Sequence, residues 1–572
     1  MESKGLILNI IPIFALPHQA PDFFTYFSNS LIKPGALVEI ELKKKKVLGY
    51  VSKTYQPAKY RHYLKKSHLS LKPVIRIINQ TAPILKYQHI LASWMKNYYG
   101  ISLGHAYNFV LPFINYLCKL KINLSYSPGN KYELRWLKDF NQLASYKSQK
   151  LLFIVPDETL INDYQEKLNN INETKVFTSK LSPSKRLSTL NQILSDKSWV
   201  LGTKNILFLP WSQLSAIVLL DESSDFYKEK FRPPFPDYRT IARKLANLLK
   251  IPLIVFDDLP SFHFFKLSNK RVITYPINFE IANSLDEVKN QILNSNRIIY
   301  FVPQKLTSYR VICNHCWSYL KCERDEEFLW LKSSNLICPI CNRIFNFEKC
   351  PYCQNNKQVD WFLKYLGGEG IIKYLENLKR KAILIKNEKD LMKANEYQDI
   401  VGSYLLWQKN WQFKFDYFIF VNFDQFFYTR DVFLREKFLR IIKHLSSFSQ
   451  KTILITSIKS PIFEHIKSGN IWNILYQERK LEKLPPFYRL VKIVFSLTDL
   501  KNLQERVLIA KNKINLKKSP KDIIIGPIFA YPEKHKRKFF LQLLLKLKSE
   551  NLLKLVEDIE FTNLYSEAEN FM

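Results

Sequence analysis

Seven of the eight cysteines of this 572-residue chain lie between positions 313 and 353. With one carboxylate they form four pairs of candidate ligands, two residues apart within each pair: Cys313 and Cys316, Cys322 and Asp325, Cys338 and Cys341, Cys350 and Cys353. A two-residue gap lets a tight turn aim two ligands at one ion, and a tetrahedral zinc needs two such pairs. Clustering of this kind is typical of metal ligation in a reducing compartment and not of disulfides. The sequence predicts one or two structural zinc ions, and the site with Asp325 is the weaker because a carboxylate replaces a thiolate.

The charge balance is strongly basic. Lys and Arg number 86 against 51 Asp and Glu, a formal net charge of +35 in a chain that is 47% hydrophobic. A folded protein with this charge is expected to have a polyanionic partner, and nucleic acid is the natural candidate. An AT-rich coding bias that enriches Lys, Ile, Asn, Phe and Tyr is the alternative explanation. Because no run of 18 apolar residues and no secretory signal is found, the sequence predicts a cytoplasmic, nucleoid-associated protein without membrane contact.

The order of strand-like and helix-like segments predicts an α/β protein of several domains. A β-rich unit is expected first, closed by a helix over 87–99 with Ile90, Leu91, Trp94 and Tyr98 at core spacing. Alternating strands and helices then predict doubly wound parallel sheets on both sides of the cysteine block. The expected strands are 151–155, 206–209, 216–220, 252–256, 382–385, 417–421, 491–495 and 538–545, with 382–385 and 417–421 central in their sheet. The expected domain boundaries are 1–112, 113–308, 309–356, 357–483 and 484–572.

A series of motifs runs in order along the chain. These are P-G-A-L-V-E-I-E-L (34–42), V-P-D-E-T (155–159), G-T-K-N-I-L-F-L-P (202–210), L-L-D-E-S-S (219–224), L-P-P-F-Y-R-L (484–490) and F-L-Q-L-L-L-K (540–546). Together with the cysteine block, the series resembles the PriA family of replication-restart DNA helicases. The resemblance implies a β-rich N-terminal DNA-binding domain, two RecA-like helicase lobes with a zinc-binding insert, and a small C-terminal α/β domain.

The resemblance also implies how the zinc ligands pair and what the chain binds. In the family the pairs are nested, the outermost with the outermost. One zinc would then sit on Cys313, Cys316, Cys350 and Cys353, and the other on Cys322, Asp325, Cys338 and Cys341. The implied partners are DNA forks and single strands, with single-strand-binding protein and other primosome or replisome proteins beside them.

The motor motifs depart from the family pattern. In S-Y-S-P-G-N-K-Y (125–132), Lys131 matches the phosphate-binding lysine, but Pro128 removes a backbone N–H and Tyr132 replaces the Mg²⁺-binding hydroxyl. Asp221 and Glu222 match the carboxylates that bind Mg²⁺ and activate water, but Ser-Ser follows them in place of Glu-His. Residues 444–451, which match the arginine-finger region, contain no arginine. The sequence therefore argues against ATP/Mg²⁺ binding and hydrolysis and makes Asp221 and Glu222 vestigial.

The candidate DNA contacts lie near the N-terminus. A basic run on a predicted hairpin could hold phosphates, and a further lysine matches one in the family's pocket for a 3′ end. Two aromatics near the start could stack on a base, although Thr25 replaces the family's Asp. These candidates are Lys43, Lys44, Lys45, Lys46, Lys72, Phe24 and Tyr26. A solvated basic turn and core aromatics are the alternative readings.

The resulting expectation is a PriA-like replication-restart protein that binds forked or single-stranded DNA with impaired ATP hydrolysis and unwinding. Two alternatives stay open. One is an active ATP-dependent 3′-to-5′ DNA helicase, which predicts DNA-stimulated ATP turnover. The other is a zinc-bearing scaffold for other replication proteins, which predicts weak DNA binding without preference for forks. The stretch between Gly104 and residue 125 leaves no room for the winged-helix domain of the family.

Overall fold

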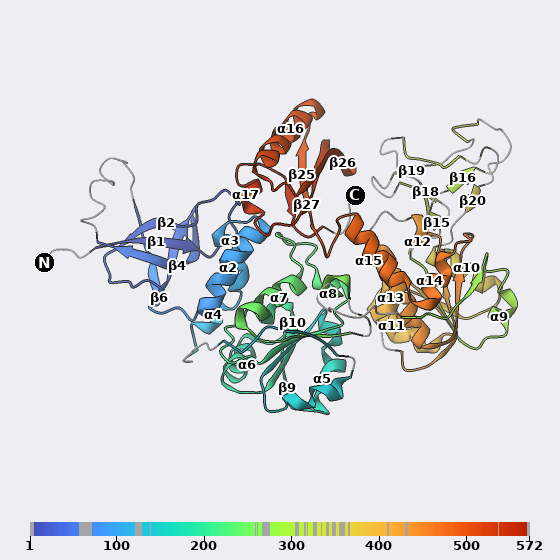
Figure 1. Ribbon diagram of the computed structural model, residues 1–572, viewed down its shortest axis with the longest axis horizontal. Helices are drawn as coiled ribbons and strands as arrows, with labels where there is room; N and C mark the ends of the chain where they lie inside the picture. The colour runs from blue at the N-terminus through green and yellow to red at the C-terminus, as the bar shows by residue number, and fades with distance from the viewer. Residues whose placement is uncertain are drawn as a thin grey trace.

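The computed structural model describes residues 5–56, 71–120, 128–137, 139–257, 259, 261–265, 275–303, 308–309, 311–313, 316, 318–323, 329–332, 335–338, 343–345, 350–353, 361–363, 367–408, 411–428, 433–535 and 537–568. Within them the chain forms a β-rich N-terminal unit, two parallel α/β lobes, a small insert and a C-terminal α/β unit (Figure 1). None of the helices in these ranges is long and apolar enough to cross a membrane.

The N-terminal unit is a six-stranded mixed sheet in the order β5-β2-β1-β4-β3-β6. Its strands are β1 (Leu6–Pro12), β2 (Phe24–Ser28), β3 (Leu37–Leu42), β4 (Lys45–Tyr55), β5 (Lys72–Pro73) and β6 (Arg76–Asn79). Three helices follow: α2 (Lys86–Tyr99), α3 (Leu103–Val110) and α4 (Ile114–Leu117). They pack between this sheet and the first lobe, where the Tyr87 hydroxyl donates to the Leu209 carbonyl at 3.0 Å.

Lobe 1 is a six-stranded parallel sheet in the order β7-β12-β11-β8-β10-β9. Its strands are β7 (Leu134–Leu137), β8 (Leu151–Val155), β9 (Thr174–Phe177), β10 (Trp199–Thr203), β11 (Ala216–Leu220) and β12 (Leu253–Phe256). Its helices are α5 (Ile161–Asn169), α6 (Pro183–Ser195), α7 (Tyr238–Leu249) and α8 (Phe262–Phe265). The central strands are apolar throughout because helices cover both faces of a doubly wound sheet.

Lobe 2 is a second parallel sheet, in the order β13-β24-β23-β14-β22-β21. Its strands are β13 (Glu280–Ala282), β14 (Ile298–Phe301), β21 (Ala382–Ile385), β22 (Asp399–Gly402), β23 (Phe415–Phe420) and β24 (Ser449–Ile455). Its helices are α9 (Lys289–Leu293), α10 (Gly368–Asn377), α11 (Glu388–Lys393), α12 (Gln425–Tyr428), α13 (Leu434–Ser447), α14 (Ile462–Ser468) and α15 (Ile471–Leu481).

The cysteine-rich insert therefore lies inside lobe 2, which corrects the expected boundaries 113–308 and 357–483. β13 and β14 precede the insert in the chain but pair with β24, β23 and β22, which follow it. In the insert, β15 (Ser308–Tyr309), β17 (Trp330–Lys332), β18 (Asn335–Ile337) and β19 (Ile344–Phe345) form one small sheet, and β16 (Val311–Cys313) pairs with β20 (Trp361–Leu363).

The C-terminal unit is a four-stranded antiparallel sheet in the order β26-β27-β25-β28, covered by one long helix. Its elements are β25 (Arg489–Leu497), α16 (Leu500–Lys517), β26 (Ile523–His535), β27 (Lys538–Leu547), α17 (Leu553–Val556) and β28 (Asn563–Tyr565). In Figure 1 this unit, in red, lies above α2 and α7, beside lobe 2. It thus meets three other parts of the chain.

Three local expectations were wrong. Residues 206–209 lie in and after a 3-10 helix, Lys204–Phe208, and the strand is β10 just before it. β21, expected at the centre of its sheet, is an edge strand. Ile90 is exposed on α2, whereas Leu91 and Tyr98 are buried. In each case long-range packing decides what a short apolar run cannot.

Candidate metal centre and candidate nucleic-acid interface

Four thiols of the insert converge on one point. The Sγ atoms of Cys313, Cys316, Cys350 and Cys353 all lie within 4.8 Å of one another. Cys313 and Cys353 are 3.9 Å apart at Sγ, and Cys316 and Cys350 are 3.7 Å apart. A tetrahedral zinc with Zn–S bonds of about 2.3 Å requires S···S separations of about 3.8 Å. The four residues therefore fit a zinc ion, and the nested grouping implied for this set is the one the fold brings together.

The second ligand set is only half described. Cys322 and Cys338 are both buried in the insert. Asp325 and Cys341 lie outside the described residues. A second zinc at these four positions therefore stays a prediction.

Glu222 follows β11 and is held in a closed network of hydrogen bonds. Its carboxylate is fully buried and accepts the Ser261 backbone N–H at 2.7 Å and the Ser261 hydroxyl at 2.5 Å. Arg239 lies 3.5 Å from the same carboxylate and donates to the Glu222 carbonyl at 3.0 Å. Burial raises the pKa of Glu222, and Arg239 offsets this only in part. Each oxygen of this carboxylate thus accepts at least one hydrogen bond from the protein, and neither is exposed to solvent.

Asp221 is the neighbouring motor candidate and has a strained backbone, with φ at +48°. The Tyr164 hydroxyl donates to its Oδ1 at 2.6 Å, and its own N–H donates to the Phe256 carbonyl at 3.1 Å. A non-glycine residue in the left-handed region costs roughly 1–2 kcal/mol and is enriched at functional sites. Asp221 thus has a strained backbone at the end of β11 and a side chain bonded to Tyr164, and its motor role stays a prediction.

Lys131 lies at the opposite edge of the same sheet. In the parallel register, Leu134 of β7 pairs with Leu253, and Leu220 of β11 pairs with Phe256. Lys131 precedes β7 at the amino edge, whereas Asp221 and Glu222 follow β11 at the carboxyl edge. Four paired residues at about 3.3 Å each separate the two edges by roughly 10–13 Å. The strand β7 and a 3-10 helix, Phe140–Tyr146, follow Lys131, not the α-helix whose N-terminus would face a phosphate. Residues 125–127 of this segment lie outside the described ranges.

A segment of lobe 1 enters the core of lobe 2. Leu259 and Phe262, just after β12, are buried in the cluster formed by α13, α15 and β23. The Glu436 carboxylate accepts the Phe262 N–H at 3.1 Å and pairs with both Arg440 and Arg479 at 2.8 Å. Arg440 also donates to the Leu259 carbonyl.

Sequence reasoning missed this interlobe network. Its three charged members are Glu436, Arg440 and Arg479, and each is nearly buried. Only the i,i+4 spacing of Glu436 and Arg440 signals the pairing, because Arg479 comes from another helix. Two arginines therefore face lobe 1 although residues 444–451 contain none, and both pair with the single carboxylate of Glu436.

The basic run occupies a two-residue hairpin turn between β3 and β4, where Leu42 pairs with Lys45. Lys43 and Lys44 both have positive φ, at +47° and +64°. A turn of this type strongly favours Asn-Gly, so two lysines there are costly for the fold. Lys43, Lys44, Lys45 and Lys46 are all exposed. Their charges are free to contact phosphates.

The predicted pocket residues lie together, but not all are open to a base. Tyr26 pairs with Lys72 across β2 and β5, and the Lys72 ammonium lies 2.6 Å from the Glu41 carboxylate. The Tyr26 ring is 3% exposed, and its hydroxyl donates to the Glu41 carbonyl at 2.8 Å. Its expected stacking role is thus wrong for this conformation. Phe24 is half-buried, and Phe23, which the sequence reading missed, is 48% exposed.

A basic β-rich domain, two parallel-sheet lobes and a thiolate cluster inside lobe 2 define a helicase-like protein with a DNA-binding domain. Residues 13–112 match the 3′ DNA-binding domain of PriA. The replication restart protein PriA of Helicobacter pylori is 22% identical over 602 residues, which cover 94% of this chain and 94% of that protein. PriA of Buchnera aphidicola is 23% identical over 484 residues, covering 74% and 66%. The chain is PriA-like along nearly its whole length and divergent in sequence from these relatives.

The solved structures that align with this chain are more distant from it than these relatives. The DUF1998 helicase MrfA bound to DNA and AMPPNP aligns at a TM-score of 0.32, with 11% identity, over 69% of this chain and 53% of that one. The helicase domain of Hef from Pyrococcus furiosus aligns at 0.30, with 9% identity, over 59% and 95%.

Proposed function

We propose that this chain binds forked or single-stranded DNA during replication restart and does so without ATP-driven unwinding. The N-terminal domain supplies the first contacts through the lysine turn at 43–46, and the zinc cluster stabilises the insert. In a cell the chain would act on nucleoid DNA beside primosome or replisome proteins, single-strand-binding protein among them.

The observation that carries the proposal is the separation of the motor residues. Lys131 and Glu222 belong to opposite edges of one sheet, so they do not lie around one γ-phosphate position. A P-loop motor needs the lysine, the Mg²⁺ ligands and the water-activating carboxylate around one γ-phosphate.

The interlobe network supports the same conclusion. ATP-driven helicases depend on lobes that open and close around the nucleotide. Here Phe262 of lobe 1 lies in the core of lobe 2, and Glu436 fastens its backbone. Opening would expose a buried phenylalanine and break the bonds from the Phe262 N–H to Glu436 and from Arg440 to the Leu259 carbonyl, which is costly.

The test measures ATP turnover and fork binding in the same zinc-loaded samples, across a salt series. We expect fork binding without DNA-stimulated turnover, and the same result for Lys131→Ala and Glu222→Gln. Turnover that disappears in Lys131→Ala would restore the reading as an active helicase. Weak binding that does not distinguish a fork from blunt duplex would instead favour the scaffold reading.

A further inference from the structure

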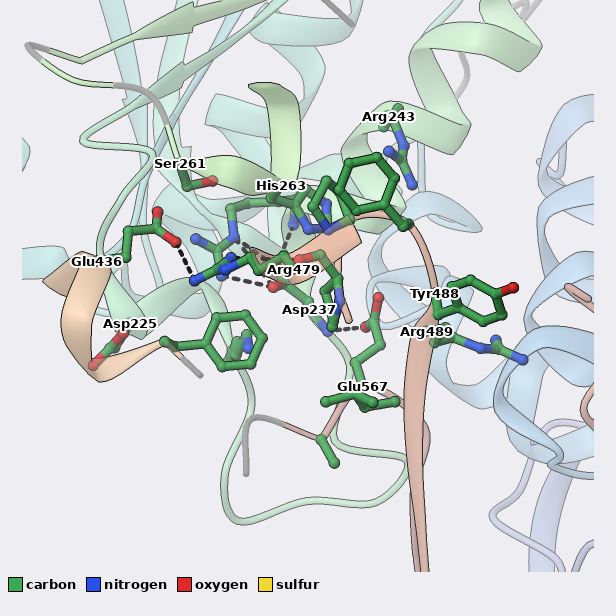
Figure 2. Close-up of a pocket in the computed structure, with 18 of the residues that line it drawn as sticks. Asp225, Asp237, Arg243, Ser261, His263, Glu436, Arg479, Tyr488, Arg489 and Glu567 are labelled. Atoms are coloured by element: carbon green, nitrogen blue, oxygen red, sulfur yellow. Dashed lines mark hydrogen bonds and ion pairs between the residues drawn. The ribbon is translucent and has the colours of Figure 1, made fainter. Parts of the chain in front are cut away.

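A cavity of about 390 Å³ lies where lobe 1, lobe 2 and the C-terminal unit meet (Figure 2). Lobe 1 contributes residues from the α7 region, lobe 2 from α13 and α15, and the C-terminal unit from β25, β27 and the segment after β28. Tyr98 of α2 completes the wall. Its size is within the ordinary range of ligand pockets.

Basic side chains outnumber acidic ones in this wall, eight Lys or Arg against five Asp or Glu. Some of the cations pair with carboxylates, Arg239 with Asp237, Lys437 with Asp225, and two further arginines with the single carboxylate of Glu436. Three others have no carboxylate partner among the described residues: Arg243, Arg489 and Lys548. The cavity thus holds positive charge that the protein itself does not neutralise.

Arg489 gives the sharpest sign of this excess. Its guanidinium donates to the Tyr98 carbonyl at 2.8 Å and to the Ser549 carbonyl at 3.3 Å, and it stacks on the Tyr98 ring. Its Nε atom is buried and has no hydrogen-bond partner among the residues that the structure describes. A buried donor without an acceptor costs about 1–3 kcal/mol, so the cationic side of this junction is incompletely satisfied.

One anion of the chain already occupies part of the cavity. The Glu567 carboxylate accepts the Asp237 backbone N–H at 2.8 Å, the Thr240 hydroxyl at 2.5 Å, and the hydroxyls of Tyr98 and Tyr99 at 3.1 and 3.3 Å. Figure 2 shows the bond that joins Asp237 and Glu567. Four donors around one carboxylate at the start of α7 form an arrangement that also suits phosphate oxygens.

The surroundings of the Glu567 carboxylate disfavour its ionised form. Removal from water and the nearby Asp237 carboxylate raise the pKa of Glu567. The donors therefore hold a carboxylate that its acidic neighbour repels. A diester phosphate carries the same single charge and can in addition reach the neighbouring arginines, with which phosphates form strong bidentate hydrogen bonds.

We propose that this junction cavity binds a phosphate group of a DNA strand, and that the Glu567 side chain occupies the phosphate position in the free chain. The inference rests on the proposed DNA-binding function and extends it to a second contact point, far from the lysine turn. Glu567 acts as an internal competitor, so a strand must displace it before the C-terminal unit and lobe 1 can share a phosphate.

The first experiment compares Glu567→Gln with Glu560→Gln in the full chain. Glu560 belongs to the same C-terminal segment and forms an exposed ion pair with Arg506, so both variants remove one carboxylate from this segment, but only Glu567 lies in the cavity. The probe is a fluorescent 20-nucleotide single strand at fixed salt. We expect Glu567→Gln to tighten binding by roughly 5–10-fold and Glu560→Gln to change it by less than about 2-fold. Equal gains in the two variants would show a net-charge effect and overturn the proposal, as would no gain in Glu567→Gln.

The second experiment removes a cation of the cavity. Arg243→Ala should weaken binding of the single strand by about 3-fold or more in the wild-type chain and cancel the gain of Glu567→Gln, whereas Arg506→Ala should do neither. This arm also decides the matter if Glu567→Gln does not fold, since unchanged binding by Arg243→Ala would sink the cavity proposal. DNA binding that survives with wild-type affinity in Arg243→Ala leaves the proposed function intact, and absence of binding in the wild type refutes that function itself.

The source of the phosphate is decided by competition. Inorganic pyrophosphate and ATP are titrated against the labelled strand at matched phosphate concentration. We expect displacement only by unlabelled DNA. Displacement by pyrophosphate or ATP that requires Arg243 would assign the cavity to a free phosphate compound and overturn the assignment to a strand.

Discussion

The Glu436 carboxylate of lobe 2 accepts the backbone N–H of Phe262 of lobe 1 at 3.1 Å, so a helix of one lobe is fastened to the main chain of the other. The same carboxylate pairs with Arg440 and Arg479. Burial disfavours its charge, but the two arginines outweigh burial and lower the pKa of Glu436. One side chain thus connects both lobes and pairs with both interlobe arginines.

Replacing Glu436 by Gln should destabilise the fold strongly. Two buried arginines would lose their carboxylate, a change that costs roughly 3–5 kcal/mol when a buried pair is broken from one side. Glu478→Gln is the matched control, because Glu478 pairs with Arg435 on the surface and exposed pairs contribute about 1 kcal/mol or less. Urea unfolding followed by tryptophan fluorescence measures both variants. Similar losses in the two would contradict the role of the network.

The stability of the chain should also carry a pH signature of Glu222. Burial raises its pKa above the usual 4.5, so the folded state binds this proton more readily than the unfolded chain. The stabilisation that the proton on Glu222 gives the folded state is fully present below pH 4.5, and it is lost as the pH rises through the pKa of Glu222 in the folded state. Glu222→Gln resembles the protonated form at every pH. The free energy of unfolding of this variant, relative to that of wild type, should therefore increase from pH 4.5 to pH 8. Unfolding curves at several pH values test this, and a difference that does not change with pH would contradict it.

The lysine turn should trade stability for DNA affinity. Lys44→Gly removes the backbone strain of a lysine at positive φ and is expected to stabilise the chain by roughly 1 kcal/mol. It also removes a phosphate contact, which should weaken DNA binding and reduce the slope of log K against log salt by about 1. Lys45→Gln is the control, because it loses the charge without relieving a positive φ. If Lys44→Gly binds DNA as tightly as wild type, the strained turn does not serve DNA.

Zinc content should follow the four converging thiols. Cys313→Ser is expected to release one zinc per chain and to unfold the insert, because a structural zinc supplies much of the folding free energy of a small metal-binding unit. Cys118→Ser, outside the cluster, should leave the metal content unchanged. Elemental analysis of gel-filtered protein measures this. Cys322→Ser tests the second predicted site, and metal content equal to wild type would exclude that site.

The sequence predicted those elements whose pattern is local. The strands at 151–155 and 216–220 are continuous apolar runs and form β8 and β11. The helix expected over 87–99 is α2 (Lys86–Tyr99), with Leu91 and Tyr98 on its buried face. The thiol pairs predicted a metal site because their spacing is itself the geometry of ligation.

What the sequence could not predict depends on pairing between distant segments. The membership of β13 and β14 in lobe 2 is decided by strands more than 90 positions later, such as β22 and β23. The position of Lys131 depends on whether the following residues form a helix or a strand, and β7 forms because its backbone pairs with β12. Likewise, Glu567 reaches Asp237 and Tyr98 only through the docking of the C-terminal unit.

The insertion of Phe262 and Leu259 into lobe 2 has a consequence for cooperativity. Trp136, on the edge strand β7 of lobe 1, packs against the cores of both lobes, and its indole N–H donates to the Asp257 carbonyl at 2.7 Å. Two sheets that share buried side chains cannot lose them one at a time, so they should melt as a single unit. The backbone amides of β11 and β23 would then exchange their hydrogens at one common slow rate. Two lobes that unfolded independently would instead show two different rates.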